Sequence, residues 1–273
     1  MFKKIITVTT LALALFSGPV LAEWKPNGSI TMMTMFPPGG GGAAMAKILK
    51  TAPADGMTIG FAVSETFSFA PAMNPKIGYT ADDFSFIGAV ANTQVGWVAA
   101  ADSPYNSLED LVAAAKDGAE IEVGVFSPRA NAAVRAIGKH FGVEFIPVPI
   151  KSGNEGRNNI LNGHLDTTLV GGPQAPHVRK GALKVLASLE AERLIVGKNA
   201  LTLIESGAPV ATFRVKWTLA APAGMPEDIL KAWTAALESS MTNETLRAFI
   251  TEKMSLKMNF TPGDLLKDEI VKG

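Results

Sequence analysis

The alternation of strand-like and helix-like segments is the feature that most constrains this fold. A β run at 29–36 is followed by a segment at 42–51 with apolar residues at helical spacing, and then by a second β run at 57–63. Two parallel strands joined by a helix form a βαβ unit. The same alternation continues along the chain, so the sequence predicts an α/β fold with doubly wound, parallel sheets and helices on both faces. In such folds ligands bind beyond the carboxyl ends of the strands.

The first 22 residues have the pattern of a secretory signal. Lys3 and Lys4 precede a short apolar run at 5–16, and the segment ends with small residues at Ala22. The apolar run is shorter than the ~20 residues that a membrane span needs. The sequence therefore predicts a signal peptide over 1–22, cleaved after Ala22, with an uncleaved N-terminal anchor as the alternative.

Charge and cysteine content exclude several classes of protein. The chain has 25 basic and 25 acidic residues, and removing Lys3 and Lys4 leaves an excess of two acids. No basic field for nucleic acid is expected from this balance. There is no cysteine, so neither a disulfide framework nor thiolate chemistry is available.

Two loops lie where a ligand could bind. The first, FPPGGGGA at 36–43, joins a strand to a helix, where free backbone N–H groups and the helix dipole favour an anion. It also matches a dinucleotide-binding pattern formally, but four consecutive glycines match many patterns, and a plain linker is a third interpretation. In the second loop, Ser127 is placed to cap a helix and Arg129 to bind a carboxylate, unless Arg129 simply faces solvent.

The sequence offers no set of catalytic residues. His140, His164 and His177 lack the spacing of metal ligands, and no G-x-S-x-G motif is present. We therefore expect no enzyme, no metal and no cofactor. Trp97 and Trp217 fall within apolar strands and are expected to be buried or near a cleft.

Six fragments, in this order, resemble one family. They are FPPGG, APADGMTIGF, SPYNSLEDLVAAAK, VFSPRANAAVRAIGKHFGVEFIPVPIKSG, LNGHLDTTLVGGPQAPHVRKGALKVLA and WTLAAPAGMPEDILKAWTAAL. Together they are similar to the periplasmic solute-binding proteins of tripartite tricarboxylate transporters, the Bug or TctC family.

The resemblance implies a two-domain, type II-like periplasmic-binding-protein fold that closes on its ligand like a Venus flytrap. Domain one would hold 23–100 and 220–273, and domain two 101–219, with crossings near 98–102 and 215–221. The implied function is capture of a small di- or tricarboxylate in the interdomain cleft and its delivery to the permease subunits of a tripartite transporter. A periplasmic monomer without nucleic-acid partners is expected.

The resemblance also suggests which residues contact the ligand, mainly through loop backbone and small polar side chains. The predicted ligand-binding residues are Phe36, Pro38, Gly39, Gly40, Ser64, Thr66, Ser127, Arg129, Asn131, Lys151 and Gly172.

The sequence departs from the family in two ways. One helix and one strand, roughly thirty residues of a supersecondary unit, are missing after the FPPGG loop. This would leave the strand at 29–36 as a bare sheet edge. Arg129 also adds a positive charge where the family is neutral. Two alternatives to transport stay open: an extracytoplasmic sensor that presents its ligand to a membrane kinase, and a degenerate relative that does not bind.

Overall fold

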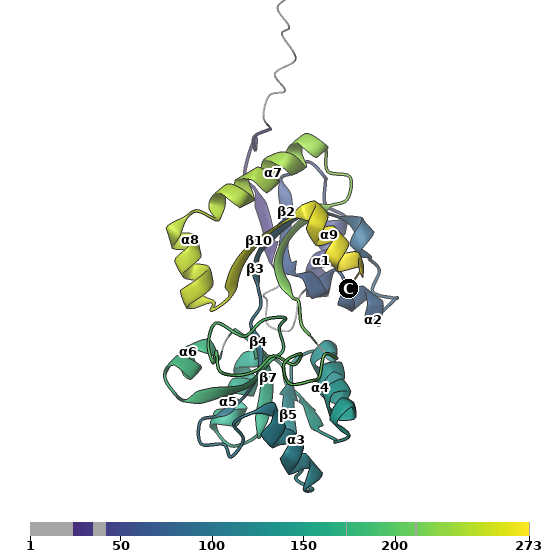
Figure 1. The fold of residues 1–273 in the computed structure, drawn as a ribbon. Coiled ribbons are helices and arrows are strands. Elements are labelled where there is room, and N and C mark those ends of the chain that lie inside the picture. The colour runs from purple at the N-terminus through teal and green to yellow at the C-terminus, as the bar shows by residue number, and fades with distance from the viewer. Residues whose placement is uncertain (1–23, 35–41, 173, 211, 273) are drawn as a thin grey trace, which may run out of the picture.

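The computed structural model describes residues 24–34, 42–172, 174–210 and 212–272. The predicted signal peptide at 1–22 and the predicted loop residues Phe36, Pro38, Gly39 and Gly40 lie outside these ranges. The described chain forms two α/β domains, one above the other in Figure 1, with two connections between them. Within the described ranges no helix is both long enough and apolar enough to cross a membrane.

Five described strands form the sheet of the first domain. In sheet order they are β1 (Thr31–Thr34), β2 (Thr58–Val63), β9 (Lys216–Pro222), β3 (Phe84–Asn92) and β10 (Lys257–Pro262). β1 and β2 pair in parallel, and helix α1 (Gly42–Lys50) lies between them in the sequence. The predicted βαβ unit is therefore confirmed, and β1 lies at one end of the sheet order.

Helices cover both faces of this first sheet. On one face α1 and α9 (Gly263–Lys272) share a core with buried phenylalanines, and on the other face α7 (Glu227–Ser240) packs through Ile229 and Leu237. The shorter elements of this domain are η1 (Ser64–Thr66), α2 (Phe69–Met73), η2 (Ala81–Asp83), α8 (Glu244–Ala248) and η3 (Phe249–Lys253).

The second domain repeats the plan with another sheet of five described strands. In sheet order they are β6 (Ile146–Pro149), β5 (Glu122–Val125), β7 (Thr167–Gly171), β4 (Val95–Ala100) and β8 (Leu183–Ser188). Its helices are α3 (Leu108–Lys116), α4 (Pro128–Phe141), α5 (Gly153–Leu161) and α6 (Ala175–Arg179). Trp97 is fully buried here, and Trp217 in the first domain is 8% exposed, so their predicted burial is confirmed.

The sheets are mixed, and the prediction of wholly parallel sheets is wrong. β9 runs antiparallel to β2 and β3, and β4 runs antiparallel to β7 and β8. The cause is the connection between the domains, because β4 and β9 are the strands by which the chain enters each domain from the other. A strand that arrives from the opposite side of the sheet runs against its neighbours.

Sheet membership places the crossings at other residues than expected. β3 ends at Asn92 and β4 begins at Val95, so the first crossing is Thr93–Gln94 rather than a point near 98–102. The second lies just before Lys216, where β9 begins, at the edge of the expected 215–221. Strand β4 thus belongs to the second sheet, although the expected boundary at 100 assigned it to domain one. The apolar run from 86 to 101 is interrupted only by Asn92, Thr93 and Gln94, a weak signal for a change of sheet.

Candidate ligand site between the two domains

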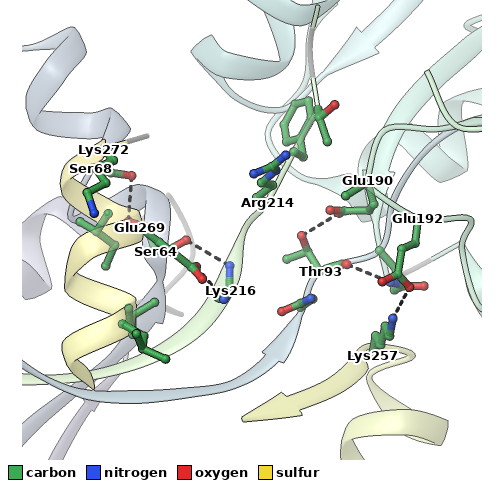
Figure 2. Close-up of a pocket in the computed structure, with 18 of the residues that line it drawn as sticks. Ser64, Ser68, Thr93, Glu190, Glu192, Arg214, Lys216, Lys257, Glu269 and Lys272 are labelled. Atoms are coloured by element: carbon green, nitrogen blue, oxygen red, sulfur yellow. Dashed lines mark hydrogen bonds and ion pairs between the residues drawn. The ribbon is translucent and has the colours of Figure 1, made fainter. Parts of the chain in front are cut away.

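A cavity of about 860 Å³ lies between the two domains, beside the second crossing (Figure 2). Ser64 and Ser68 line it from the first domain, and Arg129 lines it from the second. Part of its wall is formed by α9 and another part by the chain just after β8. Because both domains contribute to the wall, a molecule bound here would contact both.

Basic side chains outnumber acidic ones in the described wall of this cavity. The basic residues are Arg129, Arg193, Arg214, Lys216, Lys257 and Lys272. The acidic residues are Glu190, Glu192, Asp268 and Glu269. The lining residues taken alone favour an anion, although Arg129 and Arg193 also pair with Glu65 and Glu205, which do not line the cavity.

Arg129 is held in the cavity by contacts with both domains. Its Nη1 lies 3.2 Å from Oε1 of Glu65, which belongs to η1 of the first domain. Its Nη2 donates a hydrogen bond to the backbone oxygen of Thr212 at 3.2 Å, and its guanidinium carbon lies 4.8 Å from the centre of the Phe213 ring. Arg129 therefore bridges the two domains at the second crossing.

The Glu65 carboxyl group is held in place more by the charge of Arg129 than by hydrogen bonds. Only 17% of its side chain is exposed, yet Oε1 accepts no well-aligned hydrogen bond from the described residues. Burial raises the pKa of Glu65, and the charge of Arg129 opposes that rise. The ion pair is thus a close contact between a poorly hydrated carboxylate and a guanidinium.

Lys216, the first residue of β9, lines the cavity and links several elements of the first domain. It is buried, and its Nζ lies 2.6 Å from Oε2 of Glu269 and donates to Oγ1 of Thr261 at 2.9 Å. Its backbone N–H donates to the Ser64 hydroxyl at 3.1 Å, so Ser64 is tied to the second crossing. Figure 2 shows Lys216, Glu269 and Ser64 on the left of the view.

A buried glutamate fixes the first crossing. Glu190 accepts hydrogen bonds from the backbone N–H of Val95 at 2.8 Å and from the hydroxyl of Thr93 at 3.0 Å. Burial raises the pKa of Glu190 from 4.5 to about 8, although these two hydrogen bonds act in the opposite direction. At neutral pH this group is therefore mainly protonated, which increases the positive excess in the cavity.

The state of Glu190 makes stability depend on pH. Its pKa is higher in the native state than in the unfolded chain, so the free energy of unfolding falls as the pH rises from about 4.5 towards 8. Glu190→Gln removes this dependence and should add on the order of 4 kcal/mol at pH 8, because the pKa is raised from 4.5 to about 8 and each unit is worth about 1.4 kcal/mol. At pH 4.5 it should add little. Thermal unfolding at both values checks this, with the exposed Glu144→Gln as control, and an equal gain at both values would contradict it.

The structure brings two predicted site residues into the cavity and buries a third, Thr66, in η1. Ser64 and Arg129 line the wall, as described above. Thr66 is buried in η1, where its backbone oxygen accepts a hydrogen bond from the Tyr79 hydroxyl at 2.8 Å. A Cβ on Gly42 would lie 2.8 Å from Thr66 Oγ1, so this residue packs against the start of α1.

The remaining described candidates do not line this cavity. The Ser127 hydroxyl accepts from the backbone N–H of Ala130 and caps α4, as predicted. The Asn131 side chain accepts from Arg135, and Lys151 is exposed. These three residues stay untested as ligand contacts.

Gly172 connects its loop to the first crossing. Its φ of 115° favours glycine, and its N–H donates to Gln174 Oε1 at 2.7 Å. Gln174 is fully buried and donates in turn to the backbone oxygen of Gln94 at 2.7 Å. A Cβ at Gly172 would lie 3.1 Å from the backbone oxygen of Met254, so this loop touches the first domain. The role of Gly172 here is to position the loop.

Sequence reasoning missed several residues of the cavity. The signal for Lys216 that the sequence offered was a lysine at the start of an apolar strand. Glu65 was not among the predicted ligand-binding residues. The cavity residues of α9 and of 190–193 have no local motif, because only the tertiary fold brings them together.

Two domains, two crossings and a cavity between them form the architecture of a two-domain solute-binding protein. The sequence model described as "Tripartite tricarboxylate transporter family receptor" matches residues 31–261. The chain belongs to this family, TctC, and the fold and family expected from the sequence are confirmed.

Individual relatives show the same relationship. The chain is similar to "UPF0065 protein in gbd 5'region" of Cupriavidus necator, with 25% identity over 79% of this chain and 67% of that one. Two solved structures share its fold. The first is MatC from Rhodopseudomonas palustris with bound malate, which is 20% identical with a TM-score of 0.68. The match covers 85% of this chain and 81% of the MatC chain. The second is an R. palustris protein with adipate, which is 17% identical with a TM-score of 0.73. The match covers 90% of this chain and 93% of that chain.

Proposed function

We propose that this protein captures a small dicarboxylate between its two domains in the periplasm and delivers it to the permease subunits of a tripartite transporter. The observation that carries the proposal is Arg129. This arginine reaches into the cavity from the second domain, where Thr212 and Phe213 hold its guanidinium in place. A guanidinium binds a carboxylate through two parallel hydrogen bonds, which gives both affinity and orientation.

Binding of this kind makes and breaks no covalent bond. The domains are joined by two short crossings at Thr93–Gln94 and just before Lys216. A ligand that touches both domains stabilises the closed arrangement by its differential affinity for that arrangement. The permease would then recognise the closed form.

The charge of the wall and the relatives support the acidic nature of the ligand. Basic residues predominate in the described wall, and Glu190 adds little negative charge at neutral pH. Malate and adipate, found in the two similar structures, are both dicarboxylates, four and six carbons long. A second carboxylate on the ligand could use another cation of the wall, such as Lys216 or Arg214.

Thermal unfolding with a panel of acids tests the proposal. The panel holds dicarboxylates of four to six carbons and one tricarboxylate, and hexanoate and 1,6-diaminohexane serve as controls of similar length. A ligand at 100 times its dissociation constant adds about 2.7 kcal/mol, which raises the midpoint by ~5–10 °C in a chain of this size. We expect such a rise with one or more dicarboxylates and none with the controls. If the controls shift the midpoint as much as the diacids do, the carboxylate proposal is wrong.

A further inference from the structure

We propose that Glu65 is an internal competitor of the ligand: its carboxylate holds Arg129, and a ligand carboxylate binds by displacing it. This inference rests on the proposed function and adds how that site is regulated. Glu65 thereby sets a threshold, so that only an anion that binds the guanidinium better than Glu65 does can occupy the site.

The position of the pair is the first argument. Glu65 follows β2 of the first domain directly, and Arg129 lies in the first turn of α4 in the second. Their contact at 3.2 Å therefore joins the domains at Arg129, which lines the cavity, while Glu65 holds this arginine from outside the lining. A ligand carboxylate that approaches the same guanidinium must share it with Glu65 or replace Glu65.

The other contacts of Arg129 are the second argument. The guanidinium also bonds to the backbone oxygen of Thr212 and lies over the Phe213 ring, with the Phe69 ring 5.8 Å away. These contacts do not depend on the charge of Glu65. Arg129 can thus keep its position when its partner changes, as a competition mechanism requires.

The quality of the ion pair is the third argument. Glu65 is largely shielded from water but gains no aligned hydrogen bond from the described residues at Oε1. Among the described residues the guanidinium of Arg129 is thus its main compensation for lost hydration, and a ligand that offers the guanidinium a better carboxylate can replace it. A free dicarboxylate that aligns both oxygens of one carboxylate with the guanidinium is a better partner for Arg129 than Glu65 is.

Displacement also has a consequence for protons. Without Arg129, Glu65 would be a buried carboxylate near Glu190, and burial already raises its pKa. The displaced group therefore takes a proton from solution as the ligand carboxylate replaces its charge. The titratable groups whose electrostatic effects involve Glu65 are the Arg129 guanidinium, which is charged, and Glu190, which is mainly protonated at neutral pH; neither needs to titrate for this exchange.

The test is isothermal titration of the strongest-binding diacid into the parent protein and into Glu65→Gln. The variant keeps the shape of Glu65 and removes its charge. We expect the affinity to rise about tenfold, because Arg129 no longer has an anionic partner. Titrations in two buffers of different ionisation enthalpy measure proton uptake. The parent should take up a proton on binding, and Glu65→Gln should take up less.

Glu238→Gln is the matched control. Glu238 is an exposed glutamate of the first domain on α7, so its loss changes the net charge equally without touching Arg129. If Glu65→Gln fails to fold, Glu65→Asp replaces it, since a shorter carboxylate holds Arg129 less well and should raise affinity by a smaller factor.

The outcomes separate the two proposals. If the parent binds a diacid and Glu65→Gln binds it equally or more weakly, the inference is overturned and the proposed function stands. If a diacid binds with the same proton uptake in both proteins, the exchange is likewise overturned. If neither protein binds any acid of the panel, the proposed function fails and the inference fails with it.

Discussion

Arg129→Ala is expected to lower the affinity for a dicarboxylate about 100-fold, the largest functional effect of any single change in this site. The guanidinium is the partly buried cation that both domains hold in the cavity. Truncating one partner of a buried, hydrogen-bonded charge pair costs about 2–5 kcal/mol, and ~2.7 kcal/mol corresponds to 100-fold. Titration calorimetry measures the change directly.

Two variants control this prediction. Arg135→Ala removes the same charge from the same helix, but Arg135 bonds to Asn131 and does not line the cavity in the described structure, so affinity should change less than twofold. Arg129→Lys keeps the charge and loses the planar fork, so an intermediate loss is expected. If Arg129→Ala and Arg135→Ala bind the dicarboxylate with equal affinity, Arg129 does not contact the ligand.

Gly263→Ala is expected to lower the free energy of unfolding by about 3 kcal/mol, the largest loss of stability that the structure predicts for so small a change. Gly263 is the buried first residue of α9, and a Cβ there would lie 1.8 Å from the backbone oxygen of Phe86 on β3. This oxygen belongs to the backbone of a strand and cannot rotate away as a flexible side chain can. Helix α9 would therefore have to move away from the sheet.

Gly78→Ala separates this clash from a general effect of glycine replacement. Gly78 has a φ of 90° and no atom within 4 Å of an added Cβ, so its replacement costs only the strain of a left-handed residue, about 1–2 kcal/mol. Thermal unfolding should show a midpoint ~6–12 °C lower for Gly263→Ala. Because α9 lines the cavity, diacid binding should weaken as well. A midpoint no lower than that of Gly78→Ala would contradict the packing of α9.

Local patterns were sufficient to predict the class of fold. Strand, glycine-rich turn and amphipathic helix follow each other at 29–63, and the structure forms β1, α1 and β2 with β1 and β2 parallel. The cap of α4 was equally local, since the Ser127 hydroxyl accepts a hydrogen bond from the backbone N–H of Ala130 in its first turn. The direction of β4 and β9 is set by how two domains share one chain, which no local pattern contains.

The site was less predictable than the fold. Arg129 and Ser64 were expected in it and do line the cavity, because they follow the carboxyl ends of strands. Lys216 and Glu65 depend on contacts across 53 and 64 residues of sequence, with Glu269 and Arg129 respectively. Pairs that meet only through tertiary structure leave no periodic signal, so their burial and charge balance could not be predicted.

The most direct measurement is a crystal structure of the protein with the diacid that gives the largest thermal shift. Our account predicts the acid between the domains, one carboxylate within hydrogen-bond distance of the Arg129 guanidinium, and Glu65 no longer at 3.2 Å from Nη1. An acid bound away from Arg129, with the pair to Glu65 intact, would contradict the account.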